Sequence, residues 1–297
     1  MAKIFRKIYD NTFAGLLRPT LVKELRVQPG LAGFFGQVFT SINGIRLAEI
    51  RKMRASVYWG TSSPYFEESR GPNAWANFVW TPNFDFTGGR MANGLKLPYR
   101  PGAHDFLPYE GRTVRQSVER AIQEWCQPRP EITQEVSSFS ERHFMPGRML
   151  GVHVRLTDVA AGAEGRRIVG LDNIMAAVDD WCAANQEGRI YLASDDQRVV
   201  TAFTKRFPGR VAFQNCLRSD DGTSIHGHYD DGVAGSPYQK GREVLIDALL
   251  LAQCDHLIRT HSRVTAFSLC WNPKLTCQDL EREILGIDRT PWLHDRP

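Results

Sequence analysis

The residues best placed to do chemistry lie in the segment Gly151–Asp158, which reads Gly-Val-His-Val-Arg-Leu-Thr-Asp. Apolar and polar residues alternate from 149 to 156, and this alternation predicts a buried strand. His153 and Arg155 are two residues apart, so we expect their side chains on one face near the carboxyl end of the strand. Ligands of open α/β sheets bind just beyond such ends, and an arginine offers a fork of donors that suits a diphosphate. A structural salt bridge of Arg155 is the plain alternative.

Two carboxylates follow this strand in the next loop. Asp158 is expected near the reacting centre. Glu164, within the alanine- and glycine-rich stretch 160–165, is the nearest carboxylate that could deprotonate an acceptor hydroxyl as a general base. The sequence is equally consistent with Glu164 being a solvated loop glutamate without a catalytic role.

A second pair of carboxylates, Asp195 and Asp196, follows a strand predicted at 190–194. Asp195 can N-cap the next helix, which we take as its minimum role, and it is a candidate for contact with a bound nucleotide. Adjacent carboxylates could hold a metal, but neighbouring side chains diverge and the sequence offers no third ligand. We therefore expect no metal site.

Asp247 is a carboxylate within the otherwise apolar stretch 244–254. A buried carboxylate is costly without compensation, so Asp247 needs a partner or a ligand. The N1–H and N2–H donors of guanine would satisfy both of its oxygens. A paired structural aspartate is the alternative.

Two expected helix starts also carry candidate site residues. Thr260 and Ser262 follow a predicted strand and open the helical stretch 264–270, where hydroxyls and backbone N–H groups can form an anion site. A plain N-cap by Ser262 is the alternative. Gly36 closes the glycine-rich turn 30–36 and indicates a close backbone approach before the next helix.

The elements that must position these residues alternate along the second half of the chain. Strands are predicted at 149–155, 190–194, 210–214 and 256–260, and helices near 172–185, 196–206, 240–253 and 278–285. Strands that alternate with helices indicate an α/β fold with a parallel, doubly wound sheet.

The first half is richer in aromatic residues, glycine and proline. A helix at 37–53 and a strand at 56–59 predict an αβ unit, and 61–104 is loop-like. Further helices are expected at 112–126, ended by Pro128 and Pro130, and at 136–147. We place a domain boundary near residue 146, between a domain of 1–146 and a domain of 147–297.

Composition excludes several classes of protein. The 297 residues carry 37 lysines and arginines against 33 aspartates and glutamates, a net charge of +4 without a basic run, so no nucleic-acid partner is expected. The six cysteines form no CxxC pair, which favours free thiols, with Cys254 and Cys270 in the core. The longest apolar run, 244–254, is far too short to span a bilayer. We expect a cytoplasmic protein without stable membrane insertion.

Three segments together resemble the fucosyltransferase superfamily, which includes the rhizobial nodulation α-1,6-fucosyltransferase, core-fucosylation relatives and the protein O-fucosyltransferases. They are His-Val-Arg-Leu-Thr-Asp at 153–158, Tyr-Leu-Ala-Ser-Asp-Asp at 191–196 and the stretch 240–273. Gly36-Gln37 before a helix looks like the first glycine turn of the family. The resemblance covers most of 148–273 and only patches of the first half.

The resemblance implies a GT-B fold of two Rossmann-like domains. Residues 1–146 would form the acceptor side and 147–297 the nucleotide-sugar side, with the last helix able to pack back on the first domain. It also implies an inverting transfer of fucose from GDP-fucose to a hydroxyl of a glycan-like acceptor, with no metal and no further cofactor.

The resemblance assigns roles on the donor side. Arg155 matches the arginine that neutralises the departing diphosphate, and His153 matches the histidine that lines the nucleotide pocket. Asp247 matches the acid that reads guanine. Thr260 and Ser262 fall in the turn that contacts phosphate.

On the acceptor side, Asp158 and Glu164 fall where the acceptor is oriented and deprotonated. The chain departs from the family at Leu156, often a second arginine, and at Val159, often a lysine. Three alternatives stay open: another nucleotide-sugar as donor, a non-catalytic nucleotide-sugar-binding protein, and a metal-dependent phosphohydrolase built on Asp195-Asp196.

Overall fold

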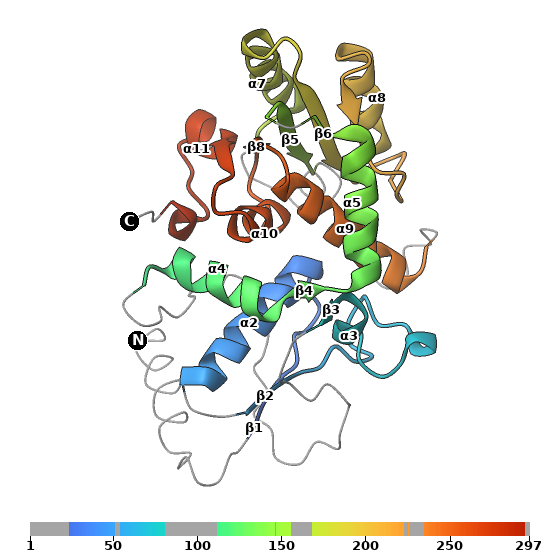
Figure 1. The fold of residues 1–297 in the computed structure, drawn as a ribbon, viewed down its shortest axis with the longest axis vertical. Coiled ribbons are helices and arrows are strands. Elements are labelled where there is room, and N and C mark those ends of the chain that lie inside the picture. Colours follow the sequence, from blue (N-terminus) through green and yellow to red (C-terminus); the bar gives the residue numbers. More distant parts are fainter. Residues whose placement is uncertain are drawn as a thin grey trace.

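The computed structural model describes residues 24–50, 54–80, 112–145, 147–155, 168–222, 225 and 235–294. The first-half elements and a larger sheet lie at opposite ends of the molecule, with helices α9 (Pro237–Ala252) and α10 (Arg263–Trp271) between them (Figure 1).

The larger sheet has five parallel strands in the order β7-β6-β5-β8-β9. They are β5 (Met149–Val154), β6 (Arg189–Ser194), β7 (Val211–Ala212), β8 (His256–Arg259) and β9 (Thr276–Asp279). Helices α7 (Leu171–Ala184), α8 (Gln197–Arg206) and α11 (Leu280–Leu285) pack on one face, and α9 and α10 pack on the other. The predicted parallel sheet, covered on both faces, is confirmed.

Strand β5 is buried along its whole length because both faces of the sheet are covered. Leu150, Val152 and Val154 belong to the core beneath α7 and α8, whereas Met149 packs in the core on the α9 side. Side chains alternate along a strand, so His153 and the following Arg155 share the face of Met149. The face predicted for this pair is therefore the face that carries α9 and α10.

The first half is built on β1 (Glu24–Val27) and β2 (Arg54–Val57), which pair in parallel and are joined through α2 (Phe34–Ile50). Three short elements follow: η1 (Glu68–Arg70), α3 (Trp75–Phe78) and β3 (Val79–Trp80). β3 pairs antiparallel with β4 (Gln127–Pro128), after α4 (Val114–Trp125). The strand predicted at 56–59 thus lies two residues earlier, because the Trp59 N–H bonds to the side chain of Asn73.

Four predicted helices have wrong boundaries. The helices expected at 37–53 and near 240–253 both begin three residues earlier, at Phe34 and Pro237. The helix expected at 136–147 is α5 (Pro130–His143). Pro130 starts this helix because the first helical turn has no backbone bond for a proline to remove. The helix expected at 278–285 starts later, since β9 occupies 276–279 and Asp279 caps α11 by accepting from the Arg282 N–H at 3.4 Å.

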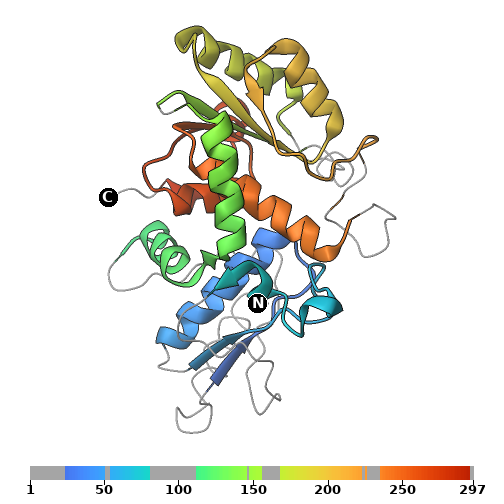
Figure 2. The ribbon, with the colours of Figure 1, turned by 45° about the vertical axis from the view of Figure 1, so that its right-hand side comes forward.

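Apolar and polar contacts join the two halves. Helix α5 runs from the first-half elements to the larger sheet (Figure 2), where Phe139 meets Tyr191 at 5.6 Å between ring centroids. At the C-terminal end, η2 (Pro291–Leu293) lies against α4, because the Arg115 Nη1 donates to the Leu293 carbonyl at 2.6 Å. The domain boundary near residue 146 stays a prediction.

All six cysteines are free, and Cys254 and Cys270 are buried, as predicted. Trp59 and Trp75 are core residues, whereas Trp80 is 53% exposed. Among the described residues, no helix has the length and apolar character needed to cross a bilayer.

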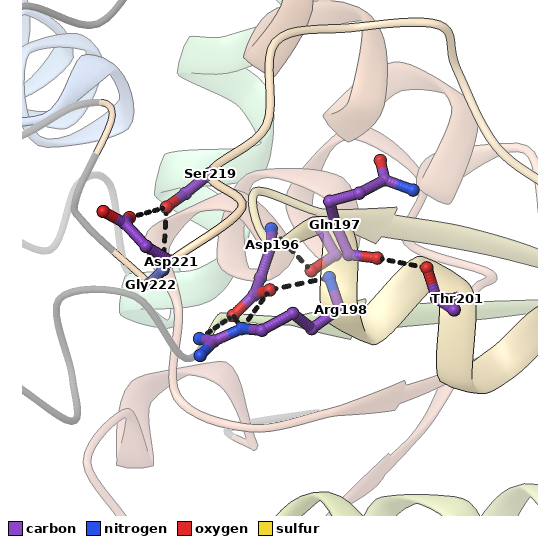
Figure 3. A network of polar contacts seen from close by, with 8 residues as sticks. Asp196, Gln197, Arg198, Thr201, Ser219, Asp221 and Gly222 are labelled. Carbon is purple, nitrogen blue, oxygen red and sulfur yellow. Dashed lines mark hydrogen bonds and ion pairs between the residues drawn. The ribbon is translucent and has the colours of Figure 1, made fainter.

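The cap of α8 differs from the prediction. Asp196, not Asp195, caps the helix: its Oδ1 accepts from the Arg198 N–H at 2.8 Å, and its Oδ2 pairs with the Arg198 guanidinium at 2.6 Å (Figure 3). Hydrogen bonds from the Arg198 guanidinium hold the pKa of the buried Asp196 carboxyl below its usual value. The backbone of Asp196 also forms a parallel β-bridge with Ser219. Its side chain caps the start of α8.

We predict that Asp196→Ala lowers the free energy of unfolding by about 1–2 kcal/mol, because the helix start loses its acceptor. Asp196→Asn should lose clearly less, since an asparagine side chain caps about as well. Urea denaturation at neutral pH measures both. Equal losses in the two variants would contradict the capping role.

Candidate functional site

A cavity of about 290 Å³ opens where β5, β6 and β8 end and where α2 and α10 begin. Six of the predicted site residues line it: Gly36, His153, Arg155, Asp195, Asp247 and Ser262. Thr260 follows β8 directly but is not among the residues that line the cavity. Asp158 and Glu164 lie outside the described residues. The structure therefore brings the predicted donor-side residues together, with Thr260 as the exception.

His153 supplies a neutral imidazole to the cavity. It is 7% exposed, and burial, reinforced by the charges of Arg155 and Arg259, lowers its pKa to about 3. Its Nδ1 is buried and has no hydrogen-bond partner among the described residues. An uncharged ring can exchange a hydrogen bond with a ligand, and it leaves the positive charge of this wall to the arginines.

Asp247 projects from α9 to the same cavity and has found partners within the protein. Its Oδ1 accepts from the Tyr191 hydroxyl at 2.5 Å and from the Gln214 Nε2. Burial raises the pKa of Tyr191, so this hydroxyl stays a donor. Among the described residues no hydrogen bond ends on Oδ2 of Asp247. The aspartate is thus structurally paired through one oxygen, and only the other oxygen is available to a ligand.

Glu243 is a site residue that the sequence analysis missed. It lies one turn before Asp247 on α9, lines the cavity and is buried. Its Oε2 accepts from the Leu217 N–H at 3.0 Å, and its Oε1 accepts from the Gln239 side chain at 2.8 Å. The i, i+4 spacing to Asp247 was the available signal, because residues four apart share one face of a helix.

The start of α10 combines a cap with a charged wall. Ser262 is the N-cap, and its Oγ accepts from the Val264 N–H at 3.1 Å, so the plain role is present. His261 and Arg263 line the cavity beside it, and neither residue is among the predicted site residues. Gly36 confirms the expected close approach: a Cβ there would lie 2.7 Å from the Nη1 of Arg263. Gly36 is, however, inside the first turn of α2 rather than before the helix.

The lining separates positive from negative groups. Arg155 and Arg263 come from the end of β5 and from the turn after β8, and these two strands are neighbours in the sheet. Asp195 comes from the end of β6, on the opposite side of β5, and Glu243 and Asp247 come from α9. A ligand with an anionic part and a part rich in hydrogen-bond donors fits such a cavity. Among the described residues no three His, Cys, Asp or Glu side chains gather as a metal site.

Solved structures place this fold in a known class. The chain is similar to the crystal structure of NodZ alpha-1,6-fucosyltransferase soaked with GDP-fucose, with 19% identity and a TM-score of 0.55 over 84% of this chain and 94% of that one. It is similar to the GDP co-crystal of that enzyme at 18% identity and a TM-score of 0.54, over 83% and 92%. The fold is therefore the α/β, GT-B fold of these fucosyltransferases, as predicted.

The family follows from the sequence comparison. Residues 112–289, more than half of the chain, match the family model of Nodulation protein Z (NodZ), and the chain belongs to this family. It is 27% identical over 180 residues to Nodulation protein Z of Bradyrhizobium diazoefficiens, covering 56% of this chain and 45% of that protein. With Nodulation protein Z of Sinorhizobium fredii it shares 27% identity over 157 residues, 48% and 45% of the two chains. The aligned region thus spans about half the length of the curated relatives.

Asp247 should make stability depend on pH. Burial, opposed by the bonds from Tyr191 and Gln214, raises its pKa to about 6. The folded state therefore holds this proton more tightly than the unfolded chain, whose aspartates titrate near pH 4, so the free energy of unfolding falls as pH rises from about 4 to about 6.

We predict that Asp247→Asn removes this dependence, since an amide oxygen still accepts the two bonds but does not titrate. Between about pH 4 and pH 7 the wild type should lose about 1–3 kcal/mol of stability relative to the variant. Urea denaturation of both proteins across this range is the measurement. Parallel pH profiles for the two proteins would show that Asp247 titrates normally.

Proposed function

We propose that this chain is an inverting glycosyltransferase that moves fucose from GDP-fucose to a hydroxyl of a glycan-like acceptor in the cytoplasm. The observation that carries the proposal is the convergence of His153, Arg155 and Asp247 in one cavity at the carboxyl ends of the strands. Membership of the NodZ family and a fold shared with structures that contain GDP or GDP-fucose support the choice of donor.

The positive wall suits the leaving group. Breaking the bond between a sugar and a diphosphate develops negative charge on the diphosphate and positive charge on the sugar ring. Arg155 emerges from the rigid, fully buried strand β5, so its donors are positioned before the reaction. A preorganised donor of this kind can contribute about 3–4 kcal/mol to the transition state. His153, held neutral, would hydrogen-bond the donor without adding charge.

The carboxylates of the cavity lining, Asp195, Glu243 and Asp247, form an acid wall that suits the base of the nucleotide. Since Tyr191 and Gln214 occupy Oδ1 of Asp247, its Oδ2, which has two lone pairs, would accept both the N1–H and the N2–H of guanine. Uracil offers a single ring N–H and no amino group, so a uridine nucleotide should bind less tightly. This arrangement favours a guanosine donor over the other nucleotide-sugars.

Acceptor activation is assigned to the residues that follow β5 in the sequence. In this proposal Asp158 orients the acceptor hydroxyl and Glu164 removes its proton as the hydroxyl attacks the anomeric carbon opposite the diphosphate. A carboxylate base contributes about 10²–10⁴-fold to such a step. The proposed reaction needs no metal, because Arg155 neutralises the leaving group.

The first experiment is calorimetric titration of the chain with GDP, GDP-fucose, GDP-mannose and UDP-glucose, each with and without EDTA. We expect GDP and GDP-fucose to bind equally well with the chelator and UDP-glucose to bind more weakly. Failure of both guanine nucleotides to bind would overturn the donor assignment. Binding of GDP-fucose without GDP release across a panel of glycan acceptors would favour the non-catalytic interpretation. Leu156 and Val159 are consistent with that interpretation, because the family often has an arginine and a lysine at these positions.

We predict that Arg155→Ala lowers the rate of GDP release in the presence of an acceptor by more than about 100-fold, because the departing charge loses its donor. The control is Arg189→Ala, which removes an arginine at the opposite end of the neighbouring strand β6. Thermal unfolding should show both variants folded. Near-normal turnover of Arg155→Ala would exclude the proposed role.

A further inference from the structure

Arg263 is a second cation on the cavity wall, and it reaches the cavity from a different element than Arg155. It is the first residue of α10, directly after the N-cap Ser262, and its side chain is half-buried. It lines the same cavity as Arg155 and His153. The first turn of a helix also carries the positive end of the helix dipole, so α10 adds to the charge of Arg263 at this point.

The position of Arg263 depends on Gly36. A Cβ at Gly36 would lie 2.7 Å from Nη1 and 3.7 Å from Cζ of Arg263. The two helices cannot move apart freely to make room, since Phe35 and Phe267 pack at 4.6 Å between ring centroids and Phe35 is 2% exposed. The guanidinium therefore lies against the backbone of α2 only because residue 36 has no side chain.

The strand order of the larger sheet explains why Arg263 lies near Arg155. β5 and β8 are adjacent, so the end of β5 and the turn after β8 put Arg155 and Arg263 on the positive side of the cavity. The carboxylates of β6 and α9 line the other side. An anionic group that enters this cavity thus meets two arginines from two different elements. One of these arginines, Arg263, also lies against α2 in the first half of the chain.

We propose that Arg263 is a second diphosphate-binding residue, and that Gly36 is the positioning residue that keeps its guanidinium in the cavity. The proposal rests on the proposed function, because it takes the anion to be the diphosphate of the donor. Arg155 and Arg263 would both bind the diphosphate from the positive side of the cavity and share the charge that develops as the sugar departs. In this role Gly36 acts through the position of Arg263.

The direct test compares Arg263→Gln with Arg263→Lys. A hydrogen bond to a charged group predicts that Arg263→Gln weakens GDP binding by about tenfold to a hundredfold and leaves guanosine binding within about threefold. Arg263→Lys, which keeps the charge, should recover part of the loss. The control is Arg282→Gln, which changes an exposed arginine in the first turn of α11, after strand β9 of the same sheet. Equal losses for GDP and guanosine would indicate a structural role and overturn the proposal.

The positioning role is tested by a double-mutant cycle with Gly36→Ala. Gly36→Ala should stay folded, because alanine is the better helix former and this offsets the close contact of the new Cβ with the Ala32 Cβ at 3.0 Å. It should weaken GDP binding by about threefold to tenfold as the guanidinium is displaced, and thermal unfolding checks that the fold is kept. In the Arg263→Gln background the same change should have no further effect. An undiminished effect of Gly36→Ala in that background would show that residue 36 acts directly on the ligand, and would overturn the positioning role.

The outcomes separate this inference from the proposed function. A wild-type protein that binds neither GDP nor GDP-fucose would overturn both. Normal GDP binding by wild type and by Arg263→Gln alike would overturn only the role of Arg263. Loss of GDP binding in Arg263→Gln with normal guanosine binding, rescued in part by lysine, would establish it.

Discussion

Helix α9 must bury nearly its whole surface, and this requirement shapes the rest of the molecule. On one side it packs on the larger sheet, where a Cβ at Gly151 would lie 3.1 Å from Leu251. On the other side it packs on the first half, where a Cβ at Gly241 would lie 2.6 Å from Phe78. Glycines thus let both surfaces come close to one helix. The two halves of the chain are joined because both exclude water from α9.

The same burial explains the acid wall of the cavity. A helix enclosed on all sides can carry carboxylates only where donors reach them, since an unpaired buried charge is costly. Glu243 receives a backbone N–H and an amide, and Asp247 receives a hydroxyl and an amide. These partners leave part of each carboxylate facing the cavity. Structural pairing and ligand recognition are therefore compatible in these residues, although the sequence analysis had weighed them as alternatives for Asp247.

The regular elements of the second half could be predicted because their periodicity is strong and local. Strand β5, strand β6 and helix α8 lie within one residue of their expected bounds. The predictions that were wrong concern positions where two neighbouring residues, or two roles of one residue, are equally consistent with the sequence. Asp195 and Asp196 are equally good caps by residue type, and Asp196 is the cap because α8 begins at Gln197, directly after the bridge to Ser219. Pro130 is equally consistent with ending one helix or starting another, and only the course of the chain after β4 distinguishes them.

The site was predictable where a strand end brings residues together and unpredictable where two segments meet in space. The shared face of His153 and Arg155 follows from the two-residue repeat of a strand. No local pattern connects Gly36 with Arg263, because the contact exists only once α2 and α10 have packed.

The acid wall extends into a loop that the sheet alone does not hold. Residues 213–218 leave β7 without further strand pairing, yet Cys216 and Leu217 line the cavity. The Leu217 N–H bonds to Glu243. Two residues further on, Ser219 donates its N–H to the Asp195 carbonyl at 2.8 Å. Gly222 donates its N–H to the Ser219 Oγ at 2.9 Å (Figure 3). Side-chain and turn hydrogen bonds therefore place this wall, so a change at the start of α8 should reach the cavity through Ser219 as well as destabilise the helix.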